Sequence, residues 1–169
     1  GGRHDEAVSY ARRALELVAR SHITSYVIYA GVCGVADVVL GAAEDARARG
    51  ETAAPTLRSD LKRSAVALSR FAGTFAMGRP RQQVVKARLA ALDGANKKAR
   101  HHFNLALRAA DECEMPHEKI LALLAAARSP AFDSAARLRR VKEALHSVHG
   151  GVAREEALAL LAEFEGIGA

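Results

Sequence analysis

The chain has 169 residues, 50% of them hydrophobic, and it carries a formal net charge of +6. Its apolar content excludes disorder throughout, its four prolines and thirteen glycines are too few for a turn-rich β-sandwich or barrel, and its two cysteines exclude a disulfide framework. With only 5% aromatic residues and no tryptophan, a core must be built from alanine, leucine and valine, which favours close helix-on-helix packing. We therefore predict an all-α protein without a signal peptide, in a cytoplasmic setting.

Apolar residues recur at helical spacing and predict eight helices and no strand. The helices are expected over residues 5–20, 25–47, 57–76, 80–92, 96–113, 116–128, 134–149 and 153–164. Pro80 and Pro116 open the fourth and sixth helices, because the first helical turn does not use the N–H that proline lacks. Asp133 is the expected N-cap of the seventh helix, and Gly150 and Gly151 are expected to end it.

The second predicted helix contains an almost uncharged stretch from Tyr26 to Ala43, in which only Asp37 is charged. This length is at the lower limit for a membrane span, and a carboxylate in the middle of a span is costly. Because the neighbouring helices are strongly amphipathic, we expect this helix to be buried among them and expect no contact with a membrane.

Positive charge is concentrated in the middle of the chain. Between Leu57 and Arg108, twelve lysines and arginines are opposed only by Asp60 and Asp93, and both ends of the chain are mildly acidic. A basic segment of this kind would attract phosphate, nucleic acid or an acidic protein surface. The alternative is that these bases are solvated outer faces of several helices, because they are spread out rather than gathered in one run.

Every second predicted helix carries a similar stripe of small and apolar residues. The stripe begins at Ala7, Leu61, Ala99 and Ser134, and the last copy is the weakest. One such stripe is a property of any amphipathic helix, but its recurrence in alternate helices predicts a stack of antiparallel hairpins that bury the stripes against each other.

The residues Gly94, Ala99, Phe103 and Ala106-Leu107 resemble the second half of a tetratricopeptide (TPR) repeat. The chain departs from that pattern because it has no tryptophan and because the repeat-ending proline is displaced to Pro116. The stretches 75–81 and 112–116 also resemble divergent repeat arrays of large bacterial signalling proteins, which usually accompany an ATPase, kinase, cyclase or transcription-regulator module. The resemblance implies a right-handed, TPR-like α-solenoid over residues 1–169.

The two ends of such a stack are incomplete. The first predicted helix is of the second-in-repeat type and the last is of the first type, so each lacks half of its hairpin, whereas natural solenoids end in polar capping helices. We therefore expect the chain to be a piece of a longer protein, or expect a partner or a second copy to cover an end.

No catalytic motif is present in the sequence, which has no phosphate-binding GxxxxGK[ST] loop, no dinucleotide-binding GxGxxG and no GxSxG elbow. Cys33 and Cys113 have no activating neighbour. His146 and His149 are spaced to share a metal ion, but no third ligand joins them. The sequence therefore predicts a protein that is not an enzyme and that has no metal and no cofactor.

The resemblance to TPR arrays implies that the first helix of each pair lines a concave groove. It places Arg81, Val85 and Arg88 on the inward face of the fourth helix and, by a looser alignment, Lys119 on the sixth. Bases along a groove would hold an acidic peptide or a C-terminal carboxylate through charge-assisted hydrogen bonds. The alternative is that they are ordinary surface bases.

The leading functional hypothesis is a non-catalytic module that mediates protein–protein or intramolecular domain contacts in a signalling protein. Tyr26 and Tyr29 are candidate apolar anchors in the groove, with core packing as the alternative. The second hypothesis is a basic helical domain that binds nucleic acid or another anionic ligand, although few aromatic residues are available for base stacking. The third is a sensor whose groove takes a small effector.

Overall fold

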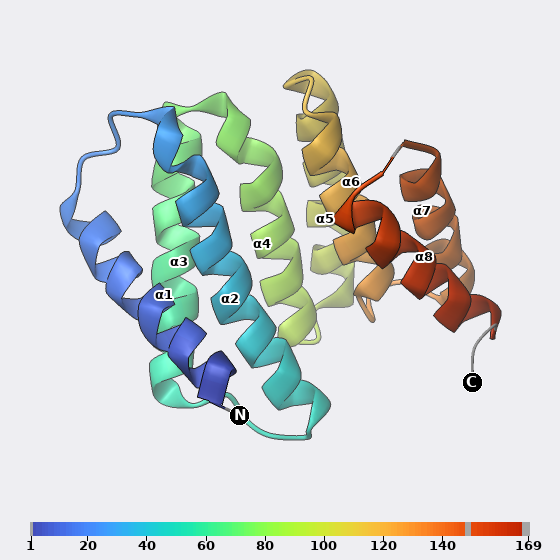
Figure 1. Cartoon of the computed structure of the whole chain (residues 1–169), viewed down its shortest axis with the longest axis horizontal. Helices are drawn as coiled ribbons and strands as arrows, with labels where there is room; N and C mark the ends of the chain where they lie inside the picture. Colours follow the sequence, from blue (N-terminus) through green and yellow to red (C-terminus); the bar gives the residue numbers. More distant parts are fainter. Residues whose placement is uncertain (1, 148–149, 167–169) are drawn as a thin grey trace.

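The computed structural model describes residues 2–147 and 150–166, which are all-helical with no strand (Figure 1). The α-helices of these two ranges are α1 (Gly2–Arg20), α2 (Tyr29–Ala48), α3 (Pro55–Thr74), α4 (Arg79–Leu92), α5 (Asn96–Glu112), α6 (Pro116–Arg128), α7 (Ser134–Ser147) and α8 (Val152–Glu165). Two single-turn 3₁₀ helices, η1 (Tyr26–Ile28) and η2 (Ala76–Gly78), precede α2 and α4. The predicted all-α class and the eight predicted helices are confirmed.

Several helix starts follow the predicted local chemistry. Pro80 and Pro116 lie in the first turns of α4 and α6. Asp133 Oδ1 accepts a hydrogen bond of 2.8 Å from the Ala136 N–H, as expected of an N-cap. Helix α3 begins at Pro55 rather than at Leu57, because proline is also well suited to the first turn of this helix.

A close approach at Gly78 fixes the connection between α3 and α4. A Cβ atom at this position would lie 2.6 Å from Cδ1 of Phe71 and 3.1 Å from Cα of Ala72. Phe71 is fully buried, and its ring centroid lies 5.4 Å from that of Tyr29 and 5.2 Å from that of Phe75. The aromatic cluster beneath this turn therefore requires glycine at position 78.

The helices contact each other in a regular order. Each helix contacts the next one along the chain, and α2, α4, α6 and α8 also contact each other in succession. Figure 1 shows α1–α3 at one end of the molecule and α7 and α8 at the other. The core follows this order as linked clusters, with one among α1–α4 that includes Leu40 and Leu68, one among α4–α6 that includes Phe103, and one among α6–α8 that includes Leu123 and Val141.

Among the described residues, one helical segment is long and apolar enough to cross a membrane by length and composition alone. This segment, Tyr26–Ala48, reaches a mean hydropathy of 1.8, and 39% of its most apolar window is buried. Core helices of soluble proteins have the same length and composition. Within the fold, α2 buries Val39 and Leu40 against its neighbours, and its carboxylates Asp37 and Glu44 pair with arginines of α4.

Candidate ligand groove

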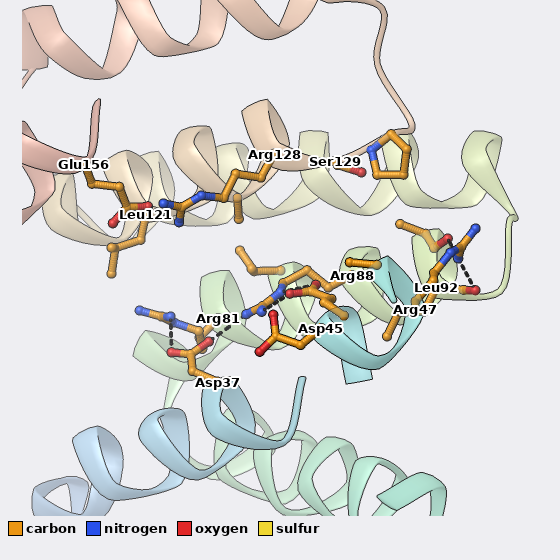
Figure 2. A pocket seen from close by; sticks show the side chains of 16 residues that line it. Asp37, Asp45, Arg47, Arg81, Arg88, Leu92, Leu121, Arg128, Ser129 and Glu156 are labelled. Atoms are coloured by element: carbon orange, nitrogen blue, oxygen red, sulfur yellow. Dashed lines mark hydrogen bonds and ion pairs between the residues drawn. The ribbon is translucent and has the colours of Figure 1, made fainter. Parts of the chain in front are cut away.

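A groove with a volume of about 750 Å³ runs along the even-numbered helices (Figure 2). Its lining comes from α2, α4, α6, the turn after α6, and α8. The apolar part of this even-helix groove consists mainly of Val84, Ala91, Leu92, Leu121, Ala125 and Pro130. The charged part consists of Asp37, Glu44, Asp45, Glu156, Arg47, Arg81, Arg88 and Arg128. The groove therefore combines small apolar surface with equal numbers of acids and arginines.

Arg81 of α4 binds carboxylates from the helices on both sides. Its Nε and Nη2 donate to Glu118 of α6 at 3.0 and 3.2 Å, and its Nη1 donates to Asp37 of α2 at 2.9 Å. The side chains of Arg81 and Glu118 are only 10% and 5% exposed. Burial acts to lower the pKa of Arg81, but Asp37 and Glu118 outweigh it and the pKa is raised, so the guanidinium stays charged.

Arg88 extends the same network along α4. Its Nε and Nη2 donate to the two carboxylate oxygens of Glu44 at 2.9 and 2.6 Å, and its Nη1 donates to Asp37 at 2.9 Å. Asp37 therefore serves both arginines, one through each oxygen. Because the Asp37 and Glu44 side chains are each 40% exposed, these two acids remain accessible from the groove, whereas Glu118 is buried.

The structure places the four predicted binding residues in three different settings. Arg81 and Arg88 lie together in the groove, and both are held by carboxylates. Val85 is 1% exposed and belongs to the core, and its neighbour Val84 lines the groove instead. Lys119 Nζ donates to Asp111 of α5 at 2.9 Å, outside the groove lining.

These differences have a simple geometric cause. Each residue turns about 100° around a helix, so an error of one position moves a side chain to another face. Val84, one position before Val85, lines the groove, and α6 presents Leu121 and Ala125 to it rather than Lys119. Val85 and Lys119 are therefore corrected to a core residue and to a residue paired with α5.

The two candidate tyrosine anchors also lie outside the groove lining. Tyr29 packs its ring against Phe71, which corresponds to the core alternative. Tyr26 is 63% exposed and lies in η1, before α2.

Several charged groove residues were not predicted as binding residues from the sequence. Arg47 of α2 donates to the carbonyl oxygens of Ala91 and Leu92, the last residues of α4, where the negative end of the helix dipole favours a cation. Arg128 of α6 pairs with Glu156 of α8. The arginines of α4 and the acids of α2 do share a sequence signal, because Asp37 and Glu44 have the same seven-residue spacing as Arg81 and Arg88.

No metal-binding group is found in the described ranges, where no three His, Cys, Asp or Glu side chains gather around one point. His149, the second histidine of the candidate metal pair, lies outside the described residues. Cys33 is buried, and burial raises its pKa to about 12, so its thiol is protonated at neutral pH.

The groove is therefore a mixed surface, in which small apolar side chains lie beside acids and arginines that already pair with each other. No family model, no curated protein and no solved structure matches this chain.

Proposed function

We propose that the chain is a non-catalytic, TPR-like stack of helical hairpins whose even-helix groove binds a segment of a protein partner or of another domain of its parent protein. The observation that carries this proposal is the groove of about 750 Å³ lined by α2, α4, α6 and α8. The succession of contacts between even-numbered helices supports the stacked arrangement, because in such a stack the first helix of each hairpin lines the inner surface.

The paired charges define the kind of segment that fits. Asp37, Glu44 and Glu118 already neutralise Arg81 and Arg88, so a strongly acidic peptide would have to displace these carboxylates. A segment with small apolar side chains would instead bury the surface of Leu121 and Ala125. We therefore favour a peptide of mixed composition over the acidic peptide expected from the sequence.

Random peptides displayed on phage and selected on the wild-type chain provide the test. Ala125→Trp fills the groove from α6, and Ala135→Trp places the same side chain on an exposed position of α7 as a control. We expect the selected peptides to bind Ala125→Trp about tenfold more weakly, a loss of about 1.4 kcal/mol, and to bind Ala135→Trp unchanged.

Ala48→Trp provides a second groove variant at an exposed residue of α2, for the case in which Ala125→Trp does not fold. Enrichment of no peptide, or equal binding to the groove variants and the control, would contradict the proposal.

A further inference from the structure

The unpaired positive charge of α4 lies on the side of the helix away from the groove. Arg79 and Lys86 each precede a groove arginine by two residues, which turns them to nearly the opposite side of α4. Unlike those of Arg81 and Arg88, neither side chain makes a hydrogen bond or an ion pair with any residue that the structure describes. Their charge is therefore available to an external ligand.

A second pocket, with a volume of about 480 Å³, lies on this side between α3, α4 and α5. Arg79 and Arg108 both line it, and Arg108 also makes no ion pair with the described residues. Gln82 Nε2 donates to Ser69 Oγ at 3.0 Å, which leaves the Ser69 hydroxyl proton to donate elsewhere. Glu112 supplies the acid of this lining, so the arginines outnumber the acid.

Positive and hydrogen-bonding groups continue from this pocket along α4 and α5. The amide oxygen of Gln83 lies 2.9 Å from Nδ1 of His102. Burial lowers the pKa of His102, and the positive charges of His101, Lys86 and Lys98 lower it further, so these bases lie close to one another. We call this surface the α4–α5 strip; it consists of Arg79, Gln82, Gln83, Lys86, Lys98, His101, His102 and Arg108.

We propose that the α4–α5 strip binds the phosphodiester backbone of a nucleic acid without reading its sequence. Lys98 and Arg108 are separated by ten residues of helix, or about 15 Å, which is longer than one phosphate group and suits a chain of phosphates. The strip contains no Phe, Tyr or Trp, and Phe103 of α5 is fully buried, so the rings it offers to bases are those of His101 and His102, which pack edge to face against each other. Binding therefore depends on phosphate contacts and falls steeply with salt.

Fluorescence anisotropy with labelled single-stranded and duplex DNA of random sequence tests this proposal over a range of salt concentrations. The strip variant combines Arg79→Gln with Arg108→Gln. The control combines Arg13→Gln with Arg20→Gln, two exposed arginines of α1 that also make no ion pair with described residues, and so removes the same charge elsewhere.

We expect the wild-type chain to bind at low salt and the strip variant to bind more weakly. The association constant K falls as salt rises. For each arginine removed, the plot of log K against log salt concentration should become shallower, by about 0.9 on duplex DNA or about 0.7 on a single strand. The control variant should keep the wild-type slope.

Three results would overturn the proposal. The first is no binding at low salt, and the second is an equal loss in the strip and control variants. The third is stronger, strip-dependent binding of polyglutamate than of DNA, which would assign the strip to an acidic protein surface. All three are independent of peptide binding in the even-helix groove, because the strip lies on the other side of α4.

Discussion

Arg81 illustrates how strongly a single side chain depends on its neighbours. Its guanidinium is almost buried and binds Glu118 through two nitrogens and Asp37 through the third. A buried charge of this kind is tolerated only when its partners are present, because removing one partner leaves charge that is neither solvated nor neutralised.

Glu118→Gln is therefore expected to lower the free energy of unfolding by about 3 kcal/mol, since it leaves the buried charge of Arg81 with Asp37 alone. Glu156→Gln is the matched control, because it breaks a pair whose arginine, Arg128, is 57% exposed. Exposed pairs contribute less than about 1 kcal/mol. Urea denaturation of both variants measures the difference, and equal losses would show that the buried network is no more important to stability than a surface pair.

At the scale of secondary-structure elements, the α3–α4 connection depends on a residue without a side chain. Gly78→Ala would place a methyl group 2.6 Å from the ring of Phe71 and close to the backbone of Ala72. We expect a loss of about 1–3 kcal/mol in unfolding free energy, which is typical of overpacking a core.

Gly73→Ala serves as the control for this substitution. Gly73 lies within α3 and is exposed, and a Cβ atom added at this position would have no other atom within 4 Å. Alanine is therefore expected to stabilise the helix by about 0.5–1 kcal/mol. Thermal unfolding of the two variants gives the comparison. A neutral Gly78→Ala would mean that Phe71 relaxes and that the close approach is not required.

The helices themselves were predictable because their signals are local. Apolar spacing, Pro80 and Pro116 in first turns, and the Asp133 cap lie within each helix and need no knowledge of the rest of the chain. The role of each arginine in α4 was not predictable in this way. Arg79 and Arg81 differ little in local sequence, and the difference between them comes from Asp37 and Glu118, which are distant in sequence and adjacent only after folding.

At the scale of the whole molecule, exposed large apolar side chains gather at the two ends. They are Tyr10 and Leu17 of α1, Tyr26 and Val27 beside α2, Val66 of α3, and Val152 and Leu158 of α8. Natural solenoids usually end in polar faces, so in the stack that we propose this distribution favours an end-to-end contact between copies of the chain.

We expect sedimentation velocity to show association that increases with protein concentration. Leu17→Lys and Leu158→Lys should each prevent extended assembly, and an equal mixture of the two variants should form a dimer, because each retains one intact and opposite end. Ala95→Lys changes an exposed apolar residue in the turn between α4 and α5, away from both ends, and should behave as the wild type. A wild-type chain that stays monomeric at all concentrations would contradict this expectation.

The arginine shared between two helix pairs also has a mechanical consequence. One guanidinium holds both α2 and α6 to α4. We therefore expect the α2–α4 and α4–α6 contacts to move together as one rigid unit, since displacing either neighbouring helix would disturb the hydrogen bonds of Arg81 to the other. Helix α8 is joined to α6 and α7 without a shared arginine of this kind, through apolar contacts, the Arg128–Glu156 and Lys142–Glu165 pairs, and the packing of Arg137 over the Phe164 ring. Under tension applied to its two ends, the molecule should separate first at α8, while the contacts of α4 with α2 and α6 stay intact.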